Sequence, residues 1–167
     1  MTEVAKIDEI DRNIIQIIQE DPSLTHTQIA KKVNRSQPTI GMRIRKLEEM
    51  GVLKYQAGVN IKSADLVLAQ VQVQTLNPER IISLIKKCPF LLNGFIISGT
   101  SNISVLIAAY ELQNLEQIVN FHFRSKGDVT KVTMDIITNV VNDFVVPIDL
   151  HFDDCDCWLN DICTSED

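Results

Sequence analysis

Three short amphipathic segments separated by turns occupy the first fifty residues, and this arrangement limits the fold more than any other feature. The first covers residues 8–20 and ends before Pro22, because proline cannot continue a helix. The second opens near Thr25 and breaks at Asn34, and Ser36 is expected to cap the third. Two helices joined by a turn of three or four residues predict a helix-turn-helix domain.

The third segment has two chemically different sides. At about 100° per residue, Ile40, Ile44 and Leu47 fall on one side and are expected to face a core. In a helix-turn-helix reader, residues at the N-terminal end of the second helix reach base edges, and Lys and Arg further along neutralise phosphates. The residues predicted to contact DNA are Ser36, Gln37, Thr39, Met42, Arg43, Arg45 and Lys46.

Charge is distributed unevenly along the chain. Six basic residues and no acidic residue lie between His26 and Lys46. Residues 1–60 hold nine Lys and Arg against eight Asp and Glu, whereas residues 61–167 hold seven against fourteen. This asymmetry indicates a head that binds a polyanion, with double-stranded DNA as the first candidate. The alternative, an ordinary solvated helix face, is disfavoured because Glu48 and Glu49 appear only after the basic run.

A specific set of positions in this head matches a known pattern. These positions are Ile7-Asp8, Asp11, Ile14-Ile15, Ile29-Ala30, Val33, Ser36, Arg43-Ile44, Leu47-Glu48, Gly51-Val52 and Tyr55. In them the chain resembles the Lrp/AsnC, or feast-famine, family of transcriptional regulators. The resemblance covers nearly all of residues 7–147. It implies a winged or extended helix-turn-helix, a strand-like linker and a ligand-sensing domain, with dimers that commonly assemble into larger rings such as octamers.

The second half predicts an α+β fold independently of that resemblance. We expect strands at 66–75, 91–98, 103–110 and 129–141, with one helix capped by Asn77 and another covering 115–124. The order is that of a ferredoxin-like βαββαβ domain. The expected divisions are a DNA-binding domain at 1–52, a linker at 53–65, a sensing and dimerisation domain at 66–147, and an acidic tail at 148–167.

A ferredoxin-like sheet has helices on one face and leaves the other bare. If apolar side chains occupy both faces, the bare one is expected to pack on a second copy of the chain. The apolar side chains assigned to the two faces are Val71, Val73, Val105, Ile107, Met134 and Ile136. A homodimer would present two recognition helices to a pseudo-palindromic site.

The turn between the second and third predicted strands is the candidate effector site. In the family a small molecule, often an amino acid, is held near this turn, which here contains Gly99, Thr100, Ser101 and Asn102. Members that bind amino acids often carry Asp where Asn102 stands, and a carboxylate suits an α-ammonium group. The alternative is that Gly99 and Asn102 serve a tight hairpin that needs positive φ.

The tail combines acidic residues with cysteines. From Asp149 to Asp167 there are seven acidic residues and no basic one. The candidate metal ligands are Cys155, Cys157 and Cys163, with His151 as a fourth. They offer soft donors for zinc, copper(I) or an iron–sulfur centre. The alternatives are a thiol switch, with Cys88 or a neighbouring cysteine as resolving partner, and an inert acidic tail.

Several function classes are excluded or disfavoured. The chain has no nucleophile elbow, phosphate loop or dinucleotide fingerprint, so we do not expect an enzyme. No apolar run is long enough for a membrane helix, and the start lacks a signal-peptide core, so a cytoplasmic location without membrane contact is expected. The favoured function is a site-specific transcriptional regulator that senses an effector. The alternative is an architectural DNA-binding protein with little sequence preference.

Overall fold

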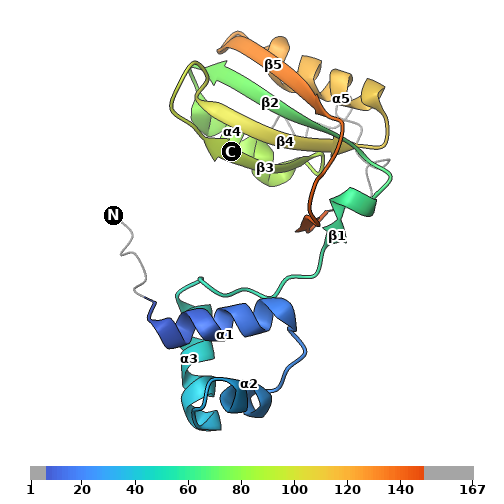
Figure 1. Cartoon of the computed structure of the whole chain (residues 1–167). Coiled ribbons are helices and arrows are strands. Elements are labelled where there is room, and N and C mark those ends of the chain that lie inside the picture. The colour runs from blue at the N-terminus through green and yellow to red at the C-terminus, as the bar shows by residue number, and fades with distance from the viewer. Residues whose placement is uncertain (1–6, 149–167) are drawn as a thin grey trace. The chain divides into compact units, whose positions relative to one another are not determined.

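The computed structural model describes residues 7–148, which form two compact units divided between Tyr55 and Gln56. The first contains helices α1 (Glu9–Glu20), α2 (His26–Lys32) and α3 (Gln37–Glu49), drawn in blue to cyan in Figure 1. Of the described helices, none is both long and apolar enough to cross a bilayer.

Each helix of the first unit begins at a polar cap. Asp8 and Asp11 form a reciprocal capping box at α1, and Thr25 and Gln28 form another at α2. Ser36 caps α3, as its sequence predicts. These side chains satisfy backbone N–H groups that have no partner inside the helix, and so they fix where each helix starts.

The core of the first unit is made by one side of each helix. The three α3 residues predicted to face inward are 0–3% exposed. Burying an aliphatic side chain of this kind contributes roughly 1.5–3 kcal/mol. The inward side of α3 is therefore anchored, and the remaining sides are left to solvent. The buried members of this core are Ile14, Ile18, Ile29, Ala30, Ile40, Ile44, Leu47 and Leu53.

The second unit is an antiparallel sheet with helices on one face (Figure 1). Its strand order is β3-β4-β2-β5, and every neighbouring pair is antiparallel. The order strand, helix, strand, strand, helix, strand confirms the ferredoxin-like prediction. The elements are β2 (Val67–Thr75), α4 (Pro78–Lys87), β3 (Leu91–Ile96), β4 (Ile103–Ala109), α5 (Leu112–Val119) and β5 (Val129–Ile137).

Two predicted elements differ in detail. The helix expected at 115–124 begins earlier, as α5 at Leu112, and its last turn is a π-helix, η2 (Asn120–Arg124). The strand expected at 129–141 ends at Ile137. Further along, β6 (Val145–Val146) pairs with β1 (Val59–Asn60), and the 3₁₀ helix η1 (Ile61–Ser63) follows β1.

The assignment of apolar residues to both faces of the sheet is wrong. In the register of the strands, Val71 lies opposite Val105 on one side and Met134 on the other. Directly paired residues share a face, so the whole predicted set lies on the helix-covered side. Val71, Val73, Val105, Ile107, Met134 and Ile136 therefore make up one face only.

The opposite face is largely polar. Gln70, Gln72 and Gln74 follow one another along it on β2, and the Gln70 side chain donates to Ser104 Oγ at 3.0 Å. An apolar cluster at one end of this face is built from Ile61, Leu68 and Ala108, with partly buried side chains from 137–148 packed against it. The chain itself thus covers part of the face that was expected to be bare.

Candidate DNA interface and effector turn

The outward side of α3 presents polar and basic groups to solvent. Gln37, Arg45 and Lys46 are exposed, and Met42 keeps 71% of its surface accessible. Among residues 7–148, Arg45 and Lys46 have no hydrogen-bond or ion-pair partner in their side chains. A helix buried on one side and carrying unpaired cations on the other is suited to bind a polyanion.

Ser36 and Thr39 contact each other at the start of α3, and their hydroxyl groups also lie near its outward surface. The Thr39 backbone N–H donates to Ser36 Oγ at 3.4 Å, and the two hydroxyl oxygens lie 2.7 Å apart. Each hydroxyl can rotate, so the pair can also present a donor or an acceptor to a ligand at the N-terminal end of α3.

Arg43 is placed differently from the sequence prediction. Its Nη1 donates to Asp8 Oδ2 at 2.8 Å and to Asp11 Oδ1 at 2.7 Å. The pKa of Asp8 is lowered, first by the N–H of Asp11 and then by Arg43, and the pKa of Arg43 is raised by both carboxylates. The guanidinium is held within the domain by two carboxylates, unlike the side chains of Arg45 and Lys46.

The reason lies in helix geometry. Position 43 is only about 40° around the helix from Leu47, so it borders the buried side instead of standing opposite it. Asp8 and Asp11 on α1 were visible in the sequence as a pair at capping spacing. That pair was the signal for a basic partner elsewhere in the domain.

A hollow of about 560 Å³ runs along the flank of α3 next to Arg45. Gly41 lets α2 approach there, since a Cβ at this position would come within 3.3 Å of His26 Nδ1. The hollow leaves one flank of α3 open to a ligand of the head. Its lining residues are His26, Gln37, Pro38, Gly41, Met42, Ile44, Arg45, Glu48 and Tyr55.

The remaining basic residues of the head lie at the end of α2. Lys31 and Lys32 are exposed in its last turn, and neither side chain forms a hydrogen bond or ion pair with the described residues. Arg35 is also exposed, with its Nη1 donating to the neighbouring Asn34 carbonyl at 2.9 Å. Asn34 takes a positive φ of 52° and so makes the turn into α3.

A match to a known domain type covers this head. A model described as winged helix-turn-helix DNA-binding matches residues 7–54. LrpA of Pyrococcus horikoshii, an HTH-type transcriptional regulator, is 29% identical over 135 residues, covering 78% of this chain and 96% of that protein. LrpC of Bacillus subtilis is 29% identical over 119 residues, covering 69% and 83%.

Solved structures share the fold of most of the chain. The structure of B. subtilis LrpC has a TM-score of 0.69 at 26% identity, with 82% of this chain and 98% of that one covered. In sequence and in fold this chain is similar to regulators of the Lrp/AsnC family. A Neisseria meningitidis transcriptional regulator, solved as its L-methionine complex, has the same fold at 20% identity, with a TM-score of 0.72 and coverages of 85% and 97%.

The similarity to these regulators confirms part of the predicted function. The curated relatives are HTH-type transcriptional regulators, so this chain is a DNA-binding regulator of transcription and not an enzyme.

The turn that the Lrp/AsnC resemblance suggested as the effector site is held in place by the side chain of Asn102, which binds the backbone of Thr75. The Thr75 N–H donates to Asn102 Oδ1 at 3.1 Å, and Asn102 Nδ2 donates to the Thr75 carbonyl at 2.7 Å. Ser101 is buried, whereas Gly99 and Thr100 are exposed. Gly99 has a φ of 155°, but Asn102 does not have the positive φ that was expected of it. The Asn102 side chain therefore clamps the end of β2 through two hydrogen bonds to the Thr75 backbone.

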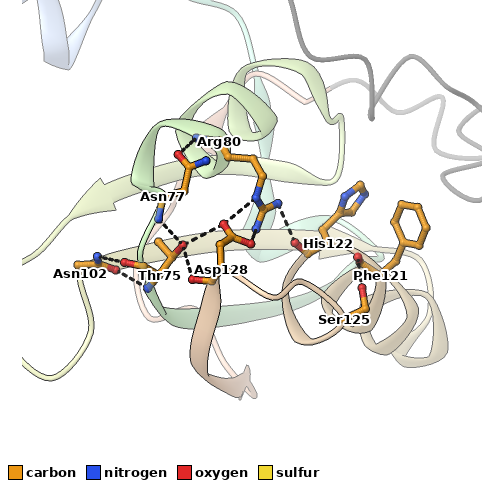
Figure 2. Close-up of polar contacts among 8 residues, drawn as sticks. All are labelled: Thr75, Asn77, Arg80, Asn102, Phe121, His122, Ser125 and Asp128. Atoms are coloured by element: carbon orange, nitrogen blue, oxygen red, sulfur yellow. Dashed lines mark hydrogen bonds and ion pairs between the residues drawn. The ribbon is translucent and has the colours of Figure 1, made fainter.

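Figure 2 shows that this clamp continues into a polar network. Thr75 Oγ1 donates to Asp128 Oδ2 at 3.2 Å, and Arg80 binds the same carboxylate through Nε at 2.9 Å and Nη2 at 3.1 Å. The Arg80 guanidinium is the main cause of the lowered pKa of Asp128. Arg80 Nη1 also donates to the His122 carbonyl at 3.2 Å, so the network joins β2, β4, α4 and η2.

The candidate metal ligands are not placed by this structure. His151, Cys155, Cys157 and Cys163 lie outside the described residues. Within residues 7–148, no three His, Cys, Asp or Glu side chains are arranged to hold a metal ion. Cys88 carries a free thiol buried in the core of the second unit, a position that disfavours it as the resolving partner of a thiol switch.

Proposed function

We propose that this protein binds a specific duplex DNA site through the outward side of α3 and does so as a homodimer. The observation that carries this proposal is the asymmetry of α3. One side is anchored by side chains that are at most 3% exposed, and the other holds cations that no carboxylate of the described residues neutralises. Such cations release counterions when they meet phosphates, which favours association.

The proposed roles follow position along α3. Ser36, Gln37 and Thr39, at its N-terminal end, are assigned to base edges through hydroxyl and amide groups. The exposed Met42 supplies apolar contact of the kind that a thymine methyl group favours. Arg45 and Lys46 are assigned to phosphates or to guanine, and the cations at the end of α2 extend the phosphate contacts.

Homodimerisation is proposed on two grounds. One α3 helix covers few base pairs, whereas two related by a two-fold axis read half-sites about one helical turn apart. On the polar face of the sheet, Phe95 keeps 54% of its surface exposed. A second copy of the chain would cover this apolar ring. Further assembly into larger rings such as an octamer follows from the family resemblance alone.

An experiment that separates a regulator from an architectural protein is selection from a random duplex pool. After repeated rounds, the selected duplex and a scrambled duplex of equal length compete for the protein at about 0.15 M salt, where non-specific binding is weak. A pseudo-palindromic consensus that binds at least about a thousandfold more tightly than the scramble supports the proposal. Near-equal affinity for the two duplexes rejects it in favour of architectural binding.

We also propose that a small metabolite is sensed at the turn. The relative solved as an L-methionine complex supports a search among amino acids. Gly99 and Thr100 are the residues left for contact, because Ser101 is buried and the amide of Asn102 is occupied. Thermal melting with each amino acid tests this. A rise in melting temperature that Thr100→Ala abolishes supports the turn, and a rise that survives Thr100→Ala places the ligand elsewhere.

A further inference from the structure

We propose that Arg43 is a positioning residue: together with Asp8 and Asp11 it fixes the orientation of α3 for DNA, and it makes no contact with DNA itself. The proposal rests on α3 being the DNA reader. It concerns three side chains of one compact unit, all within the described residues.

The three groups form a closed arrangement. Asp8 Oδ1 accepts the Asp11 N–H at 2.9 Å, and Asp11 Oδ2 accepts the Asp8 N–H at 3.1 Å. The other oxygen of each carboxylate accepts from the same nitrogen, Arg43 Nη1. Each carboxylate therefore caps α1 with one oxygen and holds α3 with the other. We call this set the α1–α3 clamp.

Charge argues against a second role for Arg43 at a phosphate. Two carboxylates face one guanidinium, so the α1–α3 clamp keeps a net negative charge. The side chain of Asp11 is only 11% exposed, and turning Arg43 outward would leave that carboxylate poorly compensated. The side chain of Arg43 is itself 28% exposed, less than an outward basic residue of α3. Its contacts hold it inside the domain.

The position of the α1–α3 clamp explains what it does. It joins the first turn of α1 to the middle of α3, and Arg45 and Lys46 follow Arg43 within one helical turn. The aliphatic core resists separation of the helices but is less specific about rotation, because apolar contacts have no direction. Two charge-assisted hydrogen bonds are directional. They fix the rotation that aims the outward cations.

The test relies on Asp8→Asn, whose expected effect on affinity differs in sign between the two roles, and on Arg43→Gln, whose expected effect on the salt slope differs. If the clamp positions α3, Asp8→Asn and Arg43→Gln should each weaken binding to the selected duplex, by about tenfold, or roughly 1.4 kcal/mol. Since both break one clamp, the double variant should be no weaker than the weaker single variant. The slope of affinity against salt should not change, because no phosphate contact is lost.

If Arg43 instead contacts a phosphate, the carboxylates compete with DNA for it. Asp8→Asn would then tighten binding, and Arg43→Gln would weaken it while lowering the salt slope by about one. Either result overturns the proposal. Glu9→Gln is the matched control, since Glu9 is exposed in the same turn of α1 and lies outside the clamp. It measures the general effect of removing a carboxylate there.

Folding and function are separated in the same set of variants. Circular dichroism melting fixes a temperature at which each variant is folded, and affinity is measured there. Asp8 is 53% exposed and asparagine is also a good cap, so Asp8→Asn keeps a folded head even if Asp11→Asn does not. A lowered melting temperature with unchanged affinity would overturn the positioning role. Arg45→Gln tests the DNA reader separately: if it has no effect on affinity, the proposed function fails and not only the clamp.

Discussion

The two units use their arginine residues in opposite ways. In the head, Arg45 stands on α3 without a partner among the described residues, whereas in the sensing unit Arg80 is bound bidentately by Asp128. The first arrangement leaves charge available to a polyanion, and the second holds β2, α4 and η2 together. The difference shows that a residue type indicates function only after its carboxylate partners are known.

Arg43 combines features of the two cases, because it lies on the same helix as Arg45 but is paired with carboxylates. It stands two positions from Arg45 on one helix, yet it is paired as Arg80 is. A basic run in a sequence therefore overstates the charge that DNA meets. Of the six basic residues from His26 to Lys46, five remain uncommitted to a carboxylate in the structure: Lys31, Lys32, Arg35, Arg45 and Lys46.

The largest predicted effect is a loss of stability when the paired arginine, Arg80, is replaced. Arg80→Ala removes three donors and leaves Asp128 without its cation, so the free energy of unfolding should fall by about 2–3 kcal/mol. Urea unfolding followed by circular dichroism measures it. Arg124→Ala is the control, because Arg124 pairs with Glu116 on a more exposed surface and should cost about 0–1 kcal/mol. Equal losses in the two variants would contradict the structural role of the network.

A smaller loss is expected at the effector turn. Asn102→Asp keeps the acceptor for the Thr75 N–H but removes the donor to the Thr75 carbonyl, so we expect a loss of about 1–2 kcal/mol. The same change supplies the carboxylate that an amino-acid effector would favour. Unfolding with and without L-methionine measures both effects. An unchanged stability would show that Asn102 does not clamp β2.

Ser36 can separate capping from DNA contact in the head. Ser36→Ala should lower stability by about 1 kcal/mol, whereas Ser36→Asp should retain the cap and the favourable charge at a helix N-terminus. The aspartate should still weaken DNA binding, because it places a negative charge at the end of α3 assigned to the bases. Thermal melting and fluorescence anisotropy with the selected duplex measure the two effects. Unchanged affinity in Ser36→Asp would remove this end of α3 from the interface.

The smallest expected effect is a pH dependence of stability that comes from the pair between Asp128 and Arg80. The pKa of Asp128 in the folded state lies below its ordinary value of 3.8, so its contribution to stability is complete above that value and is lost as the pH falls through the lowered one. Stability should therefore decline below about pH 4. Asp128→Asn should show a shallower decline over the same window. A parallel decline in the two proteins would mean that other carboxylates cause it.

Local features of the sequence predicted the structure well, and distant ones did not. The caps at Ser36 and Asn77 depend on neighbours three residues away, and both were predicted. The partner of Arg43 lies 35 positions away, and that of Asn102 lies 27 positions away. Such pairs depend on how helices and strands pack, which periodicity does not specify.

In the sheet, too, the pattern within one strand was predicted correctly and the pairing between strands was not. Alternation correctly placed Val71 and Val73 on one face of β2, with glutamines between them. Whether Val105 and Met134 share that face with Val71 depends on the register between strands. Without the register, the prediction divided these residues between two faces. The row of glutamines was the available signal that the second face is polar.

The measurement that tests the account most directly is the salt dependence of duplex binding by the wild type, Arg45→Gln and Arg12→Gln. Arg12 is an exposed arginine of α1 that forms no hydrogen bond or ion pair with the described residues, so it has the charge of Arg45 but lies on a different helix. The account predicts that Arg45→Gln weakens binding and lowers the slope of log affinity against log salt by about one, with Arg12→Gln close to wild type. Equal slopes and affinities for the two variants would show that the unpaired charge of α3 is not what meets DNA.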